Sequence, residues 1–560
     1  MDLQLVFASK GVIAQSDRSV ETFVLPGHGG VIFGTLFTRS DDPARVTSLG
    51  DGEAEQILKT AGQRLLTHYW GAYVAIFADH ATGTVRVLRD PSGALPCYYA
   101  RVGGALFLAS DVDTLYEASK RRPGIDWPGL LRYLMAPDLR NEDTALEGVK
   151  EVRPGFSLAV EADRVCQIED WSPWDHVARH SARSEPENVE ALRSTLIACH
   201  RAWASTFSHL LLGVSGGLDS SIVAALTAPH TDLSLLTMST RDPGGDERRY
   251  ARLLASHIDR PLVEAFYDLS DIDPEKTTTP HLPLPIGTPI GQCGRKHKLA
   301  IASDKSIDAF LSGAGGDNVF CLTPSAGPLL DLLFAEGVGP QLWTTLIDIC
   351  RLNGCSVWDV FRQAWARHHK GAAYRWQGDT ILLAPEHVRA AGPLSHPWLE
   401  APEGALPGKA THIAMLLRMQ VSPDFLPRRS GPPQILPLMS QPIVELCLSI
   451  PSWQWVSGGR NRSVARQAAD DCLPRELLRR RSKGGPSSFA YQFIASRRNE
   501  LPDRLLKGQL AGAGLLDLPS LEKTLSDPRP FPIEVRMRLT QLLEAEAWVR
   551  YWQQKREEFN

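Results

Sequence analysis

The sequence predicts an α/β protein of two domains. Residues 1–175 are expected to form an antiparallel β-sandwich flanked by helices, and residues 190–560 a parallel α/β domain whose last part is helical. Two observations support this expectation. Short β-branched and aromatic runs broken by Gly, Asp and Pro fill the first 170 residues, whereas strands and helices alternate from about residue 190. A chain of 560 residues is long enough for each domain to bury its own core.

In the first domain, four runs are typical of strands: GVIFGTLFTR, GAYVAIFAD, TVRVLRD and CYYARVGGALFLASD. A helix over residues 53–67 is expected to pack on the sheets. The polar stretch HVARHSARSEPENVE at 176–190 contains a proline and is the best candidate for the linker between the domains.

In the second domain, helices predicted over 188–207, 220–228 and 246–257 alternate with strands predicted over 209–214 and 233–238. This order is typical of a parallel sheet covered by helices. The last third is mostly helical and ends in the segment 532–559, whose Leu, Trp and Tyr side chains are expected to form a core stripe.

Composition argues against several functional classes. The formal net charge is -4 and 43% of the residues are hydrophobic, so neither a nucleic-acid partner nor a strongly charged membrane surface is expected. No apolar run approaches the roughly 18 residues of a membrane span. The first residues lack a basic start followed by an apolar block, and the nine cysteines are scattered, which is typical of reduced thiols in a cytoplasmic protein. No Cys/His cluster predicts zinc.

The segment VSGGLDSS, residues 214–221, follows an apolar strand and opens a helix. Its glycines allow a tight turn, and the free N–H groups of a helix N-terminus attract an anion. The hydroxyls of Ser215 and Ser220 add hydrogen-bond donors. Asp219 would repel a phosphate unless a cation lies between them, and Mg²⁺ is the natural cation. The loop matches neither GxxxxGK[ST] nor GxGxxG.

This loop resembles the pyrophosphate-binding loop of the ATP-pyrophosphatases, which cleave ATP between its α- and β-phosphates. The segment DAFLSGAGGDNVFC resembles the SGxGxD segment of asparagine synthetases, and LLTMSTRDPGGDERRYARLLASHI resembles their adenosine-binding strand and helix. LPRELLRRRSKGG resembles the segment with the catalytic lysine, which falls on Lys483. The resemblance implies ATP and Mg²⁺ as cofactors, with Asp219 and Asp317 holding the metal and acting with Lys483 in catalysis. The ATP-binding residues that it implies are Val214, Ser215, Gly216, Gly217, Asp219, Ser220, Met238, Ser312 and Gly313.

The N-terminal sequence WGAYVAIFADHATGTVRVLRDPSGALPCYYA resembles the glutaminase domain of amidotransferases, so the resemblance covers nearly the whole chain. Three features depart from a glutamine-dependent asparagine synthetase. Asp2 stands where the nucleophilic cysteine should follow the initiator methionine, and no cysteine occurs before Cys97. Ala314 stands where asparagine synthetases carry Glu and the β-lactam synthetase carries Tyr, and PLMSQP stands in place of PFLD. ATP activation is therefore expected to be retained while the nitrogen donor has changed.

Together these features resemble the lasso-peptide macrolactam synthetases, or lasso cyclases. The resemblance implies a precursor peptide, freed of its leader, that is adenylated on an Asp or Glu side chain and closed by its N-terminal amine. It also implies a leader peptidase and a leader-recognition protein as partners. The alternatives are an ammonia-dependent asparagine synthetase, a small-molecule lactam synthetase of the β-lactam type, and a non-catalytic scaffold. The alternative roles of Asp317 and Lys483 are a turn cap and a solvated basic residue.

Three further features have more than one interpretation. Arg462 and Arg466 in GGRNRSVAR would line a phosphate or carboxylate site, or form a surface pair at a helix start. Glu445 is a candidate to replace the proton acceptor missing at Ala314, or is an exposed helix residue. The Pro-rich loop 282–296 is a candidate segment for substrate access.

Overall fold

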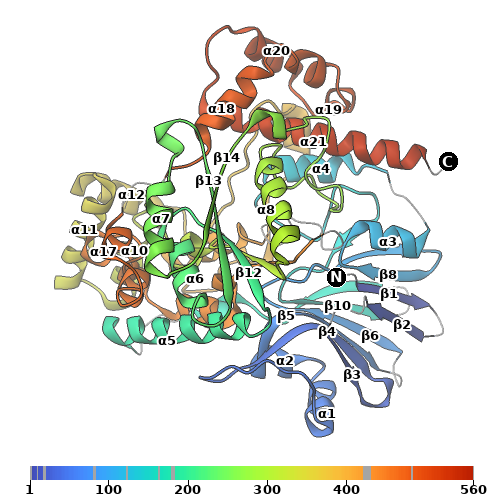
Figure 1. The fold of residues 1–560 in the computed structure, drawn as a ribbon, viewed down its shortest axis with the longest axis horizontal. Coiled ribbons are helices and arrows are strands. Elements are labelled where there is room, and N and C mark those ends of the chain that lie inside the picture. The colour runs from blue at the N-terminus through green and yellow to red at the C-terminus, as the bar shows by residue number, and fades with distance from the viewer. Residues whose placement is uncertain are drawn as a thin grey trace.

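The computed structural model describes residues 21–79, 83–120, 124–161, 164–177, 183–420, 431–480 and 484–558, together with the backbone of 3–8 and 11–16. The chain forms an N-terminal unit with two β-sheets and a C-terminal unit with one five-stranded parallel sheet, which confirms the predicted fold class. In Figure 1 the N-terminal unit lies at the lower right, and helices surround the parallel sheet to its left.

The N-terminal unit is a sandwich of two antiparallel sheets, ordered β2-β1-β8-β7-β9 and β11-β10-β6-β5-β4-β3. Phe33 and Ile76 of the second sheet belong to the same buried cluster as Tyr99 and Leu108 of the first, so the core lies between the sheets. Its strands are β1 Leu3–Ala8, β2 Gly11–Ser16, β3 Thr22–Leu25, β4 Gly30–Thr38, β5 Tyr69–Asp79, β6 Thr84–Arg89, β7 Tyr98–Val102, β8 Ala105–Ala109, β9 Val149–Glu151, β10 Phe156–Glu161 and β11 Arg164–Glu169.

The helices of this unit are α1 Asp51–Lys59, α2 Gln63–His68, α3 Val112–Ser119 and α4 Trp127–Met135. The single helix predicted over 53–67 is wrong, because the chain breaks it into α1 and α2. Gly62 precedes α2 with a φ of +90°, a left-handed conformation that glycine adopts at little cost. A Cβ at this position would lie 2.6 Å from the ring of Phe77, so the turn needs glycine here.

The parallel sheet of the C-terminal unit has the order β14-β13-β12-β15-β16. The chain builds outward from β12 to β13 and β14 on one side, and then returns to place β15 and β16 on the other. Ligands of such sheets bind at the carboxyl ends of the strands where this order reverses, here between β12 and β15. The strands are β12 His209–Gly213, β13 Asp232–Ser239, β14 Leu262–Phe266, β15 Ala309–Leu311 and β16 Gln434–Ile435.

The first helices of this unit differ from their predicted bounds by only a few residues. The helix predicted to start at 188 is α5, Glu185–Ala204, because Ser184 and Glu187 form a capping box that starts it earlier. The remaining helices are α6 Leu218–Thr227, α7 Arg248–His257, α8 Gly291–Lys305, α9 Gly316–Val319, α10 Gly327–Glu336, α11 Pro340–Asn353, α12 Val357–His369, α13 Pro385–Ala390, α14 Pro407–Leu417, α15 Gln441–Ser449, η9 Ser452–Gly459 (3-10), α16 Ser463–Ala468, α17 Arg475–Arg479, α18 Ser487–Ser496, α19 Gln509–Gly512, α20 Leu518–Ser526 and α21 Ile533–Glu557.

The predicted core stripe near the C-terminus is confirmed in α21. Leu539, Leu542, Trp548 and Trp552 are all buried. Figure 1 shows α21 at the upper right, below α18 and α20 and beside α4 of the N-terminal unit. Arg538 of α21 donates a hydrogen bond of 2.7 Å to a backbone carbonyl of α4. Within the described part of the chain, no helix is long and apolar enough to cross a membrane.

The Pro-rich loop 282–296 is packed rather than open. Leu284 and Ile286 are buried, and Tyr133 of the N-terminal unit donates a hydrogen bond of 2.7 Å to the carbonyl of Pro285. The first part of this loop therefore joins the two units, and its role in substrate access stays a prediction.

Candidate active site

The loop between β12 and α6 turns sharply at Gly216, whose φ is +62°. A Cβ there would lie 2.3 Å from the Cβ of Tyr250, so only glycine fits. Within the turn, the Gly217 N–H donates to the Ser215 hydroxyl at 3.3 Å, and the Ser215 N–H donates to the Ser220 hydroxyl at 3.4 Å. Gly217 is the N-cap of α6, so the unpaired N–H groups of that helix begin at this turn. Such a turn at a helix N-terminus suits an anion.

The loop between β15 and α9 lies directly against the first. A Cβ at Gly313 would lie 2.5 Å from the backbone nitrogen of Ser220, and one at Gly316 would lie 2.4 Å from Cγ of Asp219. Asp317 follows in the first turn of α9. The two loops therefore meet at the carboxyl ends of β12 and β15, where the sheet topology predicts a ligand.

These loops enclose a cavity of about 320 Å³, which we call the nucleotide cavity. The predicted site residues in its lining are Ser215, Gly217, Asp219, Ser220, Ser312, Gly313 and Asp317. Val214 and Gly216 belong to the same turn but do not line the cavity, and Met238 lies near the end of β13 outside the lining. Lys483 lies outside the residues that the structure describes.

Arg462 bridges the two carboxylates that were predicted to hold a metal. Its Nη1 lies 2.8 and 2.9 Å from the two carboxylate oxygens of Asp219, and 2.5 Å from Oδ1 of Asp317. The side chains of Arg462 and Asp219 are each 12% exposed, and that of Asp317 is 34% exposed. One cationic nitrogen therefore holds the position between the carboxylates that a divalent cation would take.

The donor set of the nucleotide cavity fits a magnesium-bound nucleotide. Asp219 and Asp317 supply carboxylate oxygens, which Mg²⁺ prefers, and the glycine turn leaves room for phosphate oxygens beside them. Among the described residues, no group of three or more His, Cys, Asp or Glu side chains could hold a metal ion. A magnesium ion here would take its remaining ligands from phosphate and water, as is usual for this ion.

Arg480 supports the glycine turn and was not singled out by the sequence. Its Nη1 donates to the Ser215 carbonyl at 2.8 Å, and its guanidinium lies 3.9 Å from the ring centroid of Tyr250. Its other terminal nitrogen pairs with Glu247, which also accepts a hydrogen bond of 2.8 Å from the Gly484 N–H. The run RRRSKGG indicates only a basic segment, and nothing in it shows which arginine reaches the turn.

Glu445 belongs to the contact between the two units. Its carboxylate lies 2.6 Å from Nη2 of Arg39 and accepts a hydrogen bond of 2.8 Å from Trp171. Nε2 of His176 lies 3.3 Å from it, and its side chain does not line the nucleotide cavity. The hypothesis that Glu445 replaces a proton acceptor at Ala314 is therefore wrong.

Comparison with known families covers both units. Residues 191–550 match the asparagine synthase model, and residues 41–171 match a glutamine amidotransferase domain. The first match spans the parallel sheet, both loops and Arg462, and amounts to more than half of the chain. The chain belongs to the asparagine synthase family.

Curated relatives of this asparagine synthase-family chain are distant. Amidase chyE of Penicillium rubens is 24% identical over 332 residues, 54% of this chain and 47% of that protein. Glutamine-hydrolysing asparagine synthetase 3 of Bacillus subtilis is 23% identical over 202 residues, 35% of this chain and 32% of that protein. The chain thus spans less than half the length of these relatives. A solved glutamine phosphoribosylpyrophosphate amidotransferase from B. subtilis, complexed with ADP and GMP, matches 44% of this chain and 63% of its own at 12% identity, with a TM-score of only 0.17.

The asparagine synthase family is ATP-dependent, and ATP is therefore the nucleotide to test in this cavity. Two features of this chain bear on the nitrogen source. Ala314 lines the cavity and carries no group that transfers a proton. Cys97 is buried, and burial raises the pKa of its thiol to about 12, so it is a poor nucleophile at neutral pH. Asp2 lies outside the described residues.

Proposed function

We propose that this chain is a lasso-peptide macrolactam synthetase. It adenylates an Asp or Glu side-chain carboxylate of a leaderless precursor peptide, joins that carbonyl to the peptide N-terminal amine, and releases AMP and pyrophosphate. The supporting observation is a nucleotide cavity that keeps both carboxylates around Arg462 while Ala314 replaces a proton-transferring side chain. An amine supplied by the substrate itself is consistent with this change.

The residues of the nucleotide cavity have separate roles in adenylation. The glycine turn and the hydroxyls of Ser215 and Ser220 hold the pyrophosphate portion of ATP through N–H and O–H donors. Asp219 and Asp317 would hold Mg²⁺, and the bound ion would neutralise charge on the leaving pyrophosphate. Arg462, which bridges both carboxylates, would supply positive charge beside the phosphates.

The family resemblance assigns Lys483 as the cation beside the α-phosphate. It stabilises the α-phosphate during adenylation and then the tetrahedral intermediate during amine attack; loss of one such contact costs on the order of 10²–10³ in rate. Ring closure also requires the peptide to be held with its amine near the adenylate, an orientation effect of several kcal/mol. A leader peptidase and a leader-recognition protein of the same cytoplasmic pathway supply the peptide.

The test supplies the full chain with ATP, Mg²⁺ and leaderless core peptides of lasso-peptide precursors, including any that neighbouring genes encode. We expect AMP and pyrophosphate as the nucleotide products, and a peptide whose mass has fallen by one water in mass spectrometry. Parallel reactions replace the peptide with aspartate and ammonia, or with labelled glutamine. We expect neither asparagine nor glutamate above background.

Other outcomes would contradict the proposal in separate ways. ADP and phosphate as products would exclude adenylation. Asparagine formed from aspartate and ammonia, with no change in any core peptide, would identify an ammonia-dependent asparagine synthetase. Turnover of glutamine would show that another thiol of the N-terminal unit has replaced the missing nucleophilic cysteine.

A further inference from the structure

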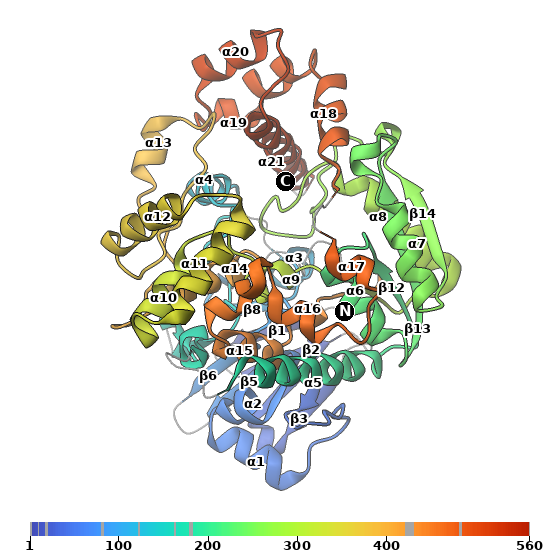
Figure 2. The ribbon, with the colours of Figure 1, turned by 90° about the vertical axis from the view of Figure 1, so that its left-hand side faces the viewer.

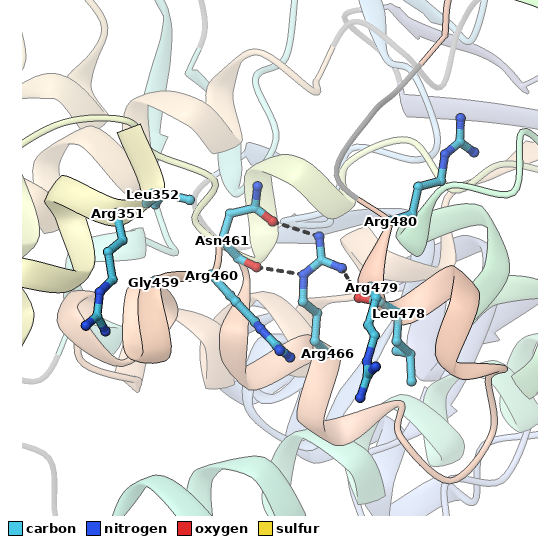
Figure 3. Close-up of a pocket in the computed structure, with 9 residues that line it drawn as sticks. All are labelled: Arg351, Leu352, Gly459, Arg460, Asn461, Arg466, Leu478, Arg479 and Arg480. Atoms are coloured by element: carbon cyan, nitrogen blue, oxygen red, sulfur yellow. Dashed lines mark hydrogen bonds between the residues drawn. The ribbon is translucent and has the colours of Figure 1, made fainter. Parts of the chain in front are cut away.

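Beside the nucleotide cavity lies a second cavity of about 580 Å³, shown in Figure 3. Five of the nine residues that line it are arginines, and none of the nine is acidic. The arginines are Arg351, Arg460, Arg466, Arg479 and Arg480. We call this cavity the arginine pocket. It is bounded by the end of α11, the turn after η9, α16 and α17.

Three of these arginines have no carboxylate to neutralise them. Among the described residues, no Asp or Glu lies within ion-pair distance of Arg460, Arg466 or Arg479. Arg466 donates instead to neutral oxygens of Asn461, the backbone carbonyl at 2.9 Å and the side-chain oxygen at 2.8 Å, drawn as dashed lines in Figure 3. Burial, and then repulsion by Arg462, lowers the pKa of Arg466 to about 10. Arg480 pairs with Glu247, Arg351 lies 3.9 Å from Asp348, and Asp219 and Asp317 act on Arg466 from a distance. The positive charge of Arg460, Arg466 and Arg479 therefore gathers here without a carboxylate in direct contact.

The lack of a carboxylate at ion-pair distance from these three arginines is local to this pocket. In α7 of the same unit, Arg248 pairs with Asp246 at 2.7 Å, and Arg252 pairs with Glu264 at 2.6 Å. The chain as a whole carries a formal net charge of -4. The arginine pocket is thus a concentrated positive site on a protein that is not basic overall, and such a site attracts anions.

One stretch of backbone connects the two cavities. Asn461 lines the arginine pocket, while the next residue, Arg462, reaches the carboxylates of the nucleotide cavity. Arg480 also lines the pocket and donates to the Ser215 carbonyl in the glycine turn. The arginine pocket is therefore one layer of side chains away from the turn that suits a phosphate.

We propose that the arginine pocket is a second anion site, which takes inorganic pyrophosphate after it leaves the glycine turn. This inference rests on the proposed function, because it needs pyrophosphate as a product. A phosphate monoester carries about 1.5 to 2 negative charges near neutral pH, and arginine forks bind phosphate oxygens in pairs. A single peptide carboxylate would neutralise only one of Arg460, Arg466 and Arg479, whereas the several charges of pyrophosphate match all three.

Transfer to this pocket separates pyrophosphate from the adenylate. In the reverse of adenylation, a pyrophosphate oxygen attacks the α-phosphorus, which re-forms ATP and frees the carboxylate. Pyrophosphate held among the arginines lies outside the glycine turn and cannot make that attack. The pocket thus favours forward reaction with the amine, and no covalent bond forms or breaks within it.

The test measures binding of inorganic pyrophosphate to the full chain by titration calorimetry, with Mg²⁺ and without ATP or peptide. The variants are Arg460→Gln, Arg479→Gln and their combination, because both side chains are exposed and lie outside the nucleotide cavity. The control is Arg249→Gln, which removes the same charge from a side chain that is 78% exposed, pairs with Glu476 and lies outside the pocket. We expect the parent and the control to show two binding events, and the double variant to lose one of them.

Unchanged binding in the double variant, or an equal loss in Arg249→Gln, overturns the inference. Citrate and a glutamate-rich peptide serve as competitors, and displacement of pyrophosphate by either at a lower concentration would make this a carboxylate site and overturn the assignment. Circular dichroism confirms that each variant is folded. The titration needs no turnover, so it tests the anion site separately from the proposed function. If the parent chain forms no AMP, the proposed function is contradicted. If the double variant still loses one pyrophosphate-binding event, the anion site is supported.

Discussion

Two charge clusters in this protein are opposites of each other. In the N-terminal unit, Glu151 lies between Arg89 and Arg140, with oxygen–nitrogen distances of 2.5 and 2.6 Å. In the C-terminal unit, Arg462 lies between the two carboxylates of the nucleotide cavity. The first cluster places one anion between two cations, and the second places one cation between two anions.

The two charge clusters differ in how far their side chains are exposed to solvent, and this difference indicates different roles. The side chains of Glu151, Arg89 and Arg140 are at most 1% exposed, and Arg89 also donates to three backbone carbonyls. In the second cluster Asp317 is 34% exposed, and the buried Nε of Arg462 has no hydrogen-bond acceptor among the described residues. A closed and fully bonded cluster stabilises the fold. An open cluster can exchange its cation for another.

The largest expected effect comes from the open cluster. Asp219→Asn and Asp317→Asn each remove a charged metal ligand, so ATP-dependent release of pyrophosphate is expected to fall by at least two to three orders of magnitude. Circular dichroism should show an intact fold. Asp503→Asn, which changes an exposed carboxylate of the same unit outside the cavity, is the matched control and should keep its rate. If Asp219→Asn and Asp317→Asn lower the rate only slightly, as the loss of a turn cap would, the open cluster has no catalytic role that distinguishes it from the closed one.

The closed cluster should respond in stability. Glu151→Gln leaves Arg89 and Arg140 buried without their counter-charge, and breaking such a buried pair costs about 3–5 kcal/mol of unfolding free energy. Urea unfolding measures the change. The control is Glu142→Gln, a partly exposed residue that pairs with Lys150, which should cost less than about 1 kcal/mol. Equal costs for the two variants would mean that burial does not set the role of a cluster.

Glu544 is another buried carboxylate, and it accepts hydrogen bonds from Thr277 and Thr278 rather than pairing with an arginine among the described residues. Burial raises its pKa to about 7, while its Oε1 accepts hydrogen bonds of 2.6 Å from Thr277 and Thr278. The folded state therefore holds the proton more tightly, and stability from this group is lost as pH rises from about 4.5 to about 7. At 1.36 kcal/mol per pKa unit, the loss is about 3 kcal/mol.

Glu544→Gln removes this dependence, because the amide stays neutral. Relative to the parent, the variant should gain about 3 kcal/mol of unfolding free energy between about pH 4.5 and about pH 7, and nothing further above that. Urea unfolding at a series of pH values measures the difference. A constant difference across this range would show that burial does not raise the pKa of Glu544.

The exchange of cations in the open cluster predicts a smaller effect. Arg462→Met removes the competing cation, so Mg²⁺ should bind the nucleotide-free protein about tenfold more tightly, a change of about 1.4 kcal/mol. Calorimetric titration with Mg²⁺ measures it. Arg252→Met, on the surface of α7, is the control and should leave the affinity unchanged. An unchanged or lower affinity in Arg462→Met would show that the arginine does not occupy the metal position.

The smallest effect is expected at the contact between the units. Glu445→Gln keeps an oxygen that can accept from Trp171 but loses the charge that faces Arg39, at a cost of about 1 kcal/mol, as for a weakly exposed ion pair. Synthetase activity should stay at the parent level, because this side chain does not line the nucleotide cavity. A large loss of activity with an unchanged melting temperature would restore Glu445 as a catalytic candidate.

The loops of the site were predictable because local rules form them. The β12 and α6 bounds lie within two residues of the predicted ones, since an apolar run, two glycines and a helix N-terminus are recognisable in sequence. The place of Asp317 followed from the same logic at β15. Both carboxylates indeed lie together, because the two strands are neighbours in a parallel sheet.

Contacts between distant segments were not predictable. The sequence left Arg462 either at a phosphate or carboxylate site or in a surface pair at a helix start, because its bridging position depends on partners 243 and 145 residues away in sequence. Arg480 and the arginine pocket were missed for the same reason. Local pattern says which side chains are charged, whereas the tertiary fold decides which of them are neutralised.

Tryptophans show the same limit. Trp548 and Trp552 of α21 are buried, whereas Trp358 and Trp365 of α12 are 80% and 69% exposed. Figure 2 shows why, because α21 lies among other elements while α12 lies at the edge of the molecule. Their chemistry is identical, and only the neighbouring elements distinguish them.

The contact between the two units has an evolutionary consequence. Glu445 is compensated by Arg39, Arg538 of α21 is bonded to a carbonyl of α4, and Tyr133 holds the Pro-rich loop. A lineage that deleted the N-terminal unit would leave these polar groups and the apolar surface around them without partners. A chain that lacked the N-terminal unit would therefore be unstable, even if that unit catalysed no reaction. A domain can therefore be retained after it has lost its catalytic activity, because the neighbouring domain depends on its contacts for stability.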